Sequence, residues 1–119
     1  MFDIDKFKQM NDEHGHVFGD IILRNVAECI NDKVRSSDFV VRYGGDEILV
    51  VQTNSTNKSM RFFIDRIEEA MDSSCDLGVE VSASYGFAAR SECEKPEEVL
   101  MLADKRLYEK KEALAKEGI

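Results

Sequence analysis

The sequence predicts an α/β (α+β) domain in which a ferredoxin-like, antiparallel-containing sheet carries helices packed on it. Two observations lead to this class. Runs of β-forming residues and runs with helical apolar spacing alternate along the chain in the order β-α-α-β-β-α-β-α. Two of the β-forming runs meet at Gly44-Gly45-Asp46, which is typical of a hairpin turn. The inner β-α-β-β-α-β part of this order is the ferredoxin-like pattern.

Each element has its own local signal. Phe2 and Ile4 alternate with acids, as at the end of a strand, and Gly15 interrupts the first helical stretch. A period-two pattern is clearest at residues 79–89, and Pro96 suits the first turn of a last helix. The expected elements are a strand end at residues 2–5, helices at 6–12 and 18–34, strands at 39–43 and 47–52, a helix through 60–71, a strand at 79–89 and a helix from 96.

The composition limits the classes of function. A chain of 119 residues favours a single domain, and 43% hydrophobic with 34% charged residues fits a folded protein. The net charge of −8 argues against a nucleic-acid partner, because phosphate backbones need a basic footprint. No apolar run approaches the ~20 residues that span a bilayer, so no membrane contact is expected. Three widely spaced cysteines form no metal motif, and a cytoplasmic location is expected, in which this chain could be one part of a larger signalling protein.

Acidic side chains are expected to converge at one edge of the sheet. The first and third strands of a ferredoxin-like sheet are neighbours, so Asp3 and the pair Asp46-Glu47 could meet in space. Carboxylates brought together repel one another unless a hard cation such as Mg²⁺ binds them. Gly44 and Gly45 allow positive φ and a close approach of bare backbone to a ligand. The alternative is that Asp46 only forms the turn and Glu47 is a solvated edge residue.

Four segments in order resemble one known family. "FDIDKFKQMNDEHGHVFGD", "RYGGDEI", "VSASYGFAA" and "ADKRLYEKK" are similar to segments of GGDEF domains, the diguanylate cyclases. The resemblance covers nearly the whole chain. It implies a palm-type fold, as in nucleotidyl cyclases, that binds GTP with two Mg²⁺ or Mn²⁺ ions per site. It further implies that a homodimer condenses two GTP molecules into cyclic di-GMP and pyrophosphate.

The resemblance also implies residue roles. Asp3, Asp46 and the Ile4 carbonyl correspond to metal ligands, and Glu47 to a group that holds metal or eases 3′-hydroxyl deprotonation. The residues implied to contact GTP are Lys6 and Phe7 through backbone N–H groups, Asn11 and Asp20 at guanine, and Gly44, Gly45 and Lys105 near the triphosphate. A carboxylate accepts from guanine N1–H and the 2-amino group, whereas adenine offers no such edge.

A second motif implies product inhibition. Arg35 and Asp38 form an R-x-x-D motif, at the offset from Gly44 that the family's inhibitory cyclic di-GMP site has. Arginine offers a planar fork for phosphate and guanine, and aspartate accepts from guanine. Arg66, on the next helix, corresponds to a further arginine of that site. Alone, the motif is weak, because Arg and Asp also flank ordinary helix ends.

The chain departs from the family pattern in several places. Ile48 replaces a Phe and should still face the core, and Met101 stands where a phosphate-binding Lys is frequent. The usual N-terminal helix and closing strand are not evident, so residues 1–119 are expected to be a single GGDEF domain shortened at both ends, with a sensory domain in the parent protein. An active cyclase, a non-catalytic sensor of cyclic di-GMP or GTP, and a structural or dimerisation fragment therefore all remain possible.

Overall fold

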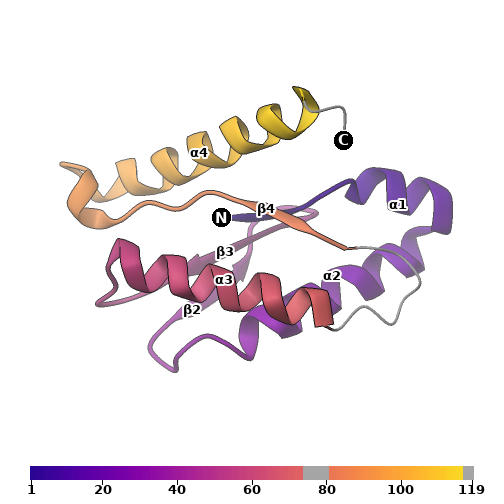
Figure 1. The fold of residues 1–119 in the computed structure, drawn as a ribbon, viewed down its shortest axis with the longest axis horizontal. Coiled ribbons are helices and arrows are strands. Elements are labelled where there is room, and N and C mark those ends of the chain that lie inside the picture. Colours follow the sequence, from indigo (N-terminus) through magenta and orange to yellow (C-terminus); the bar gives the residue numbers. More distant parts are fainter. Residues whose placement is uncertain (74–80, 117–119) are drawn as a thin grey trace.

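The predicted order of elements is confirmed by a computed structural model that describes residues 1–73 and 81–116 (Figure 1). One short 3-10 helix, η1, is added to that order. No helix within the described ranges combines the length and apolar character needed to cross a bilayer. The elements are β1 (Phe2–Ile4), α1 (Phe7–His14), α2 (His16–Asn31), β2 (Phe39–Arg42), β3 (Glu47–Val51), α3 (Asn57–Ser73), β4 (Ala83–Tyr85), η1 (Arg90–Glu92) and α4 (Pro96–Lys116).

The four strands form one antiparallel sheet in the order β2-β3-β1-β4. β1 is therefore an interior strand, as a ferredoxin-like sheet requires, and it neighbours both β3 and β4. In the register of β1 and β3, Asp3 lies opposite Glu47 and Phe2 opposite Ile48. Figure 1 shows α2 and α3 on one face of the sheet and α4 on the other, with α1 at the end towards which β1 points.

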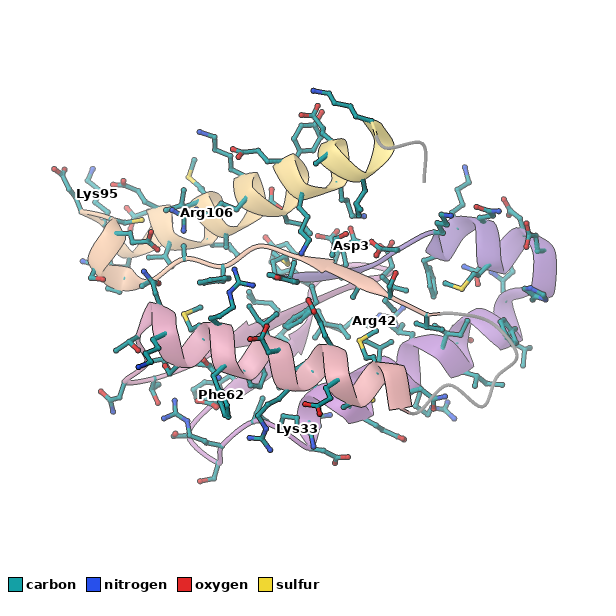
Figure 2. The ribbon with its side chains drawn as sticks, in the orientation of Figure 1. Asp3, Lys33, Arg42, Phe62, Lys95 and Arg106 are labelled. Atoms are coloured by element: carbon teal, nitrogen blue, oxygen red, sulfur yellow. The ribbon has the colours of Figure 1, made fainter. Side chains whose placement is uncertain are left out.

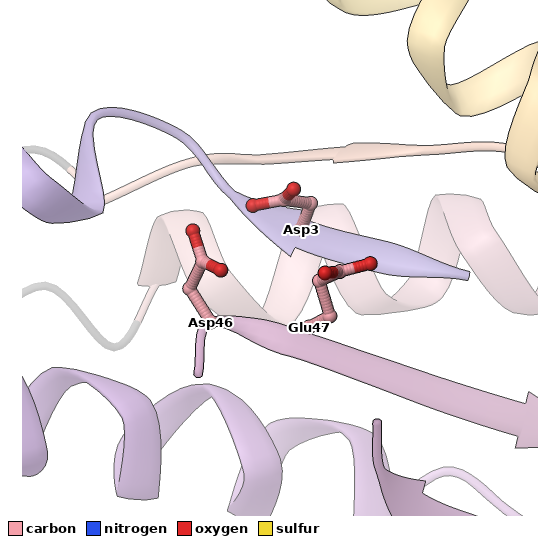
Figure 3. Close-up of side chains that lie close together, drawn as sticks. All are labelled: Asp3, Asp46 and Glu47. Atoms are coloured by element: carbon pink, nitrogen blue, oxygen red, sulfur yellow. The ribbon is translucent and has the colours of Figure 1, made fainter. Parts of the chain in front are cut away.

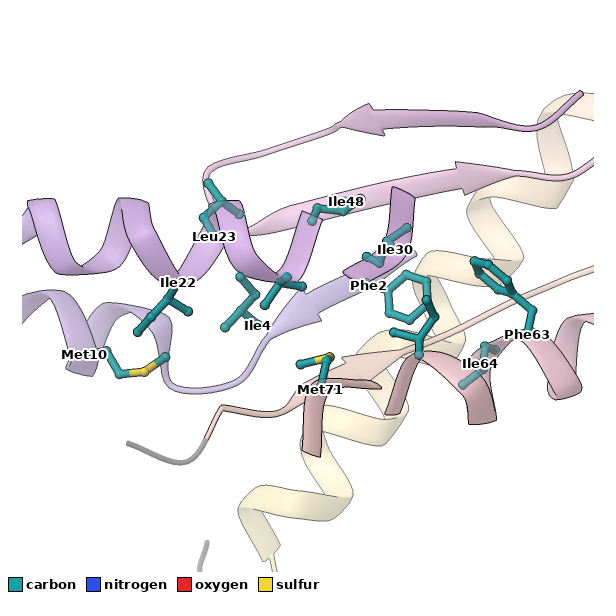
Figure 4. Close-up of a cluster of buried hydrophobic side chains, with 12 residues drawn as sticks. Phe2, Ile4, Met10, Ile22, Leu23, Ile30, Ile48, Phe63, Ile64 and Met71 are labelled. Atoms are coloured by element: carbon teal, nitrogen blue, oxygen red, sulfur yellow. The ribbon is translucent and has the colours of Figure 1, made fainter. Parts of the chain in front are cut away.

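The hydrophobic core lies between the sheet and the helices α2 and α3. Ile22, Ile30 and Ile67 are fully buried there, and Phe2 meets the ring of Phe63 edge-on at 6.4 Å (Figure 4). Burying apolar side chains of this size stabilises a fold by about 1.5–3 kcal/mol each. The sequence expectation for Ile48 is confirmed, since only 3% of it is exposed.

Two helix boundaries follow from backbone chemistry. Gly15 has φ 89°, a left-handed value that favours glycine, and it separates α1 from α2 as the sequence predicts. Pro96 is the first residue of α4, where a missing N–H costs no helical hydrogen bond.

The strand predicted at residues 79–89 is shorter than expected. β4 contains only Ala83–Tyr85, and positions 79 and 80 lie outside the described residues. The N–H of Gly86 donates to the Met1 carbonyl, but after Gly86 the chain packs against α4 instead of a strand. A Cβ at Gly86 would lie 2.2 Å from the carbonyl oxygen of Ala103, so only glycine permits this contact. Arg106 of α4 then donates to the Phe87 carbonyl at 2.8 Å. This tertiary contact, which no period-two pattern reveals, lies directly beyond the strand.

Candidate active site

Three carboxylates converge at the junction of β1 and β3 (Figure 3). Asp3 lies on β1, Glu47 is its partner across the strands, and Asp46 immediately precedes β3. One oxygen from each of them lies within 4.8 Å of the others. The N–H of Ile4 donates to the Asp46 carbonyl at 3.1 Å and holds the hairpin end against β1. The convergence expected from strand order is therefore present in the structure.

The surroundings of Asp3 disfavour its charged form. It is 9% exposed and lies near the centre of the molecule (Figure 2). Burial raises the pKa of Asp3 to about 6, with Asp46 adding to the rise and Lys111 opposing it. The ammonium nitrogen of Lys111 lies 2.6 Å from Asp3 Oδ2, while Asp3 Oδ1 is buried with no hydrogen-bond partner among the described residues. A buried oxygen without a partner costs free energy that a bound cation would remove.

The donor set fits a hard divalent cation. Asp3, Asp46 and Glu47 offer carboxylate oxygens only, which Mg²⁺ prefers over nitrogen or sulfur ligands. Mg²⁺ usually takes one or two protein carboxylates and is shared with substrate phosphates, and this cluster offers such carboxylates. The orphaned Asp3 Oδ1 is the structural observation that favours a metal here.

The hairpin that carries Asp46 is held by an arginine. Arg42 Nε donates to the Gly44 carbonyl at 3.3 Å, and Arg42 Nη2 donates to the Gly45 carbonyl at 2.9 Å. A Cβ at Gly44 would lie 2.9 Å from Glu47 Oε1, so the backbone passes close beneath that carboxylate. The expected positive φ is wrong for both hairpin glycines, because Gly15 alone among the described glycines has it. Close approach, and not backbone handedness, is what Gly44 provides.

A cavity of about 540 Å³ opens beside the start of α1. Lys6 precedes the helix with φ 56°, a left-handed value, and Phe7 is the first helical residue. The lining residues are Asp5, Lys6, Gln9, Met10, Glu13, His14, Ser82, Lys111, Leu114 and Ala115. The N-terminus of α1 and two lysines thus border one cavity. Such an end attracts anions, because its first N–H groups have no helical partner.

Lys111 is a candidate that the sequence reasoning missed. The expected cation, Lys105, is exposed and does not line the cavity that Lys6 and Lys111 border, and Met101 is 70% exposed. Ala103 and Leu107 are buried, and Lys111 follows them at the same four-residue spacing. A lysine that continues the core-facing stripe of a helix was the signal available in the sequence.

The two residues implied at guanine lie at the junction of α1 and α2. Asn11 is on α1 and Asp20 is exposed near the start of α2. A Cβ at Gly19 would lie 1.7 Å from Asn11 Oδ1, so this glycine makes room for the asparagine. Asn11 Oδ1 is buried and has no partner within the described part of the chain.

Arg35 and Asp38 form a compact pair before β2. Arg35 Nη2 lies 3.2 Å from Asp38 Oδ1, and Arg35 also donates to the Thr53 carbonyl and to Ser55 Oγ at 2.6 and 3.0 Å. Burial alone would raise the pKa of Asp38, but hydrogen bonds from Arg35 and the backbone of Thr53 outweigh it and lower that pKa.

The third residue of the implied inhibitory site, Arg66, lies against an aromatic ring of its own helix. The Arg66 guanidinium lies 5.8 Å from the centroid of the Phe62 ring on α3. In the described part of the chain, no hydrogen bond or ion pair joins Arg66 to Arg35 or Asp38. Arg35 and Asp38 thus form a bonded pair, and a place for Arg66 beside them stays a prediction.

Comparison with known proteins identifies the family. The family model described as "Diguanylate cyclase, GGDEF domain" matches residues 1–117. The chain is 38% identical over 113 residues to diguanylate cyclase DosC of Escherichia coli (strain K12), and 33% identical over 117 residues to diguanylate cyclase A of Treponema denticola. The chain belongs to the GGDEF family.

Solved structures agree with this assignment. The GGDEF domain of DgcB from Caulobacter crescentus, solved in complex with c-di-GMP, matches this chain with a TM-score of 0.85 at 30% identity. The match covers 94% of this chain and 70% of that one. Diguanylate cyclase SiaD of Pseudomonas aeruginosa, solved with its activator SiaC, gives a TM-score of 0.81 at 26% identity, covering 94% of this chain and 45% of that one. The matches cover 91% and 94% of this chain but only 25% of DosC and 32% of the Treponema protein. The chain thus spans about a quarter to a third of the curated relatives it matches.

Proposed function

We propose that this domain is a diguanylate cyclase that condenses two GTP molecules into cyclic di-GMP and releases two pyrophosphates. The observation that carries the proposal is the carboxylate cluster of Asp3, Asp46 and Glu47 beside a cavity bordered by Lys6 and Lys111. An acid cluster that can hold metal, next to a cavity that two lysines and a helix N-terminus border, suits the triphosphate of a nucleotide. Relatives named as diguanylate cyclases support this choice of reaction.

Asp3, Asp46 and the Ile4 carbonyl would hold the metal, with Glu47 at the open side. We propose Mg²⁺, or Mn²⁺ in its place, at two ions per GTP. When bound, these ions would neutralise phosphate charge and activate the attacking oxygen. The protein itself would hold the acids at a fixed separation. It would do so through the β1–β3 register and the hydrogen bond from the Ile4 N–H to the Asp46 carbonyl.

The triphosphate would lie between the start of α1 and the lysine of α4. The backbone N–H groups of Lys6 and Phe7 open a helix, where anions are favoured. Lys111 replaces Lys105 in this role, because it reaches Asp3 and lines the same cavity as Lys6. Gly44 and Gly45 let the hairpin approach the phosphates without side-chain obstruction.

Guanine would lie against Asn11 and Asp20. The exposed carboxylate of Asp20 can accept hydrogen bonds from guanine N1–H and the 2-amino group. Adenine lacks that donor pair, so a site built to accept from it should reject ATP. Asn11 packs closely against Gly19. This packing supports a base-recognition role for Asn11 over that of a solvated residue at a helix end.

The reaction requires two copies of the domain. The 3′-oxygen of each GTP forms a bond to the α-phosphorus of the other, and the bond from that phosphorus to the oxygen bridging to the β-phosphate breaks, so that pyrophosphate leaves. The 3′-hydroxyl proton passes to water, with Glu47 lowering the cost of that step. One domain holds one GTP, so two domains must face each other as a homodimer. A sensory domain in the parent protein would set how frequently they meet.

Feedback by the product is the proposed role of Arg35 and Asp38. The Arg35 guanidinium is already oriented by Asp38, Thr53 and Ser55, while half of its side chain, 52%, stays exposed. An oriented and accessible fork is suited to the phosphates and guanines of cyclic di-GMP. Arg66 would complete the site only if its side chain turns away from Phe62.

A second candidate is a non-catalytic sensor of cyclic di-GMP or GTP. The same preoriented Arg35–Asp38 pair favours it, because that pair does not depend on the acid cluster. Incubation of the protein at high concentration with GTP and Mg²⁺, with chromatography of the products, separates the two. Formation of cyclic di-GMP that is abolished by EDTA supports the cyclase. Bound but unconverted nucleotide supports the sensor, and no binding of either nucleotide rejects both.

A further inference from the structure

Asp5, the second acid of the "FDID" segment, has no place in the metal cluster. Its carboxylate accepts a hydrogen bond from Ser82 Oγ at 2.7 Å and another from Ser84 Oγ at 2.6 Å. Its backbone N–H donates to the Ser82 carbonyl at 2.9 Å. Three hydrogen bonds thus join Asp5 to Ser82 and Ser84, two residues apart in the β4 segment.

These bonds explain why Asp5 is not a ligand. Residues two apart on a strand lie on the same face, so Asp5 could point where Asp3 points. Both of its carboxylate oxygens are instead occupied by serine hydroxyls, and the group of acids able to share a metal is Asp3, Asp46 and Glu47 among the described residues. Ser84 is fully buried, so its hydroxyl depends on this acceptor.

The hydrogen bonds of Asp5 matter because of Lys6, the residue that follows it. Lys6 has φ 56°, a conformation that long side chains rarely adopt and that costs free energy. Its carbonyl accepts the N–H of Met10 at 3.0 Å, the first hydrogen bond of α1. The Lys6 turn is therefore held on one side by α1 and on the other by Asp5.

We propose that Asp5 is a positioning residue, whose anchorage to Ser82 and Ser84 fixes the turn from β1 into α1. The turn directs the first N–H groups of α1 towards the cavity next to the carboxylate cluster. This extends the proposed function, because those N–H groups are the ones assigned to the triphosphate. Asp5 acts through the backbone of Lys6 and Phe7 and touches no reacting atom.

Hydrogen exchange tests the turn without any ligand. In Asp5→Ala, the Met10 amide should lose at least tenfold in protection relative to the Asp32 amide, which is bonded within α2. Asp5→Asn keeps one acceptor oxygen and should retain part of that protection. It also keeps the test decisive if the alanine variant does not fold. Ser84→Ala should lower it in the parent but add little in Asp5→Ala. Parent-like Met10 protection in folded Asp5→Ala overturns the proposal.

Calorimetry with inorganic tripolyphosphate and Mg²⁺ tests the consequence. Asp5→Ala should bind magnesium tripolyphosphate at least tenfold more weakly, while its affinity for Mg²⁺ alone stays within twofold of the parent, because the three ligands remain. Loss of both affinities together would instead indicate general damage and overturn a positioning role. If the parent itself does not bind magnesium tripolyphosphate, the proposed function fails, and the Met10 exchange result alone decides the role of Asp5 in the turn.

Discussion

The ammonium group of Lys111 on α4 lies 2.6 Å from the Asp3 carboxylate on β1. The pair joins the last helix to the interior strand of the sheet. It places a cation where a buried acid has its pKa raised to about 6, and where the cavity beside α1 begins. In the absence of metal, Lys111 stabilises the charged form of Asp3. With metal and triphosphate bound, the same ammonium group would be close enough to meet a phosphate.

Replacing Lys111 by Met tests this double role. We expect Lys111→Met to weaken binding of GTP with Mg²⁺ by about 10- to 150-fold, since a hydrogen bond to a charged group contributes about 1.5–3 kcal/mol. Affinity for Mg²⁺ alone should not fall, because a competing cation is removed from Asp3. Lys105→Met is the matched control and should bind GTP like the parent. Equal GTP affinities in the two variants would contradict the assignment of Lys111.

Asp46→Asn tests the metal centre. The change keeps the shape of the side chain and removes one of three converging charges, so metal-dependent GTP turnover should fall by at least a hundredfold. Stability should change little, because the site loses repulsion between acids. Turnover is measured as pyrophosphate release over a range of Mg²⁺ concentrations. Asp65→Asn, an exposed acid on α3, is the control, and turnover at its level in Asp46→Asn would remove Asp46 from the ligand set.

Asp20→Ser tests the reading of guanine. The variant should lose discrimination between GTP and ATP, because the acceptor for guanine N1–H and the 2-amino group is gone. Competition binding of the two nucleotides measures the ratio directly. Asp65→Ser removes the same charge at a distance and should leave that ratio unchanged. A parent-like ratio in Asp20→Ser would show that another group reads the base.

Arg35→Ala tests the feedback site. Removing the guanidinium should weaken cyclic di-GMP binding by about 1.5–3 kcal/mol, the range for hydrogen bonds to charged groups. Calorimetry gives this affinity, with Arg24→Ala, an exposed arginine of α2, as the control for net charge. The change also removes the guanidinium that bonds to Asp38, so thermal unfolding should be followed in parallel. Unchanged affinity in a folded variant would remove Arg35 from the site.

Gly86→Ala tests the close contact between α4 and the residue that follows β4. The added Cβ would lie 2.2 Å from the Ala103 carbonyl oxygen and 2.3 Å from the Leu107 nitrogen, both backbone atoms that cannot yield. The free energy of unfolding should fall by about 1–3 kcal/mol, as for other overpacked sites. At Gly45 an added Cβ meets nothing within 4 Å, so Gly45→Ala should stay within about 0.5 kcal/mol of the parent. Denaturant unfolding of both variants provides the comparison.

The sequence by itself determined the order of elements and the meeting of the acids. Apolar spacing along the chain predicts each helix and strand, because burial of one face is a local property of the pattern. Once that order indicated a ferredoxin-like sheet, the first and third strands had to be neighbours. Asp3 and Asp46-Glu47 could therefore be placed together before any coordinates, although the ion they hold stays a prediction.

The tertiary structure alone decided the contacts between elements that are distant in sequence. No local pattern reveals that α4 packs directly against Gly86, one residue past the end of β4. Lys111 reaches Asp3 only because the rotation of α4 about its axis turns the Ala103–Leu107 stripe towards the sheet. The partners of Asp5 were likewise set by tertiary structure, because β4 and the residue before it bring two serine hydroxyls to its carboxylate oxygens. Side-chain partners of this kind are set by the relative placement of packed elements, and that placement is a property of the whole fold.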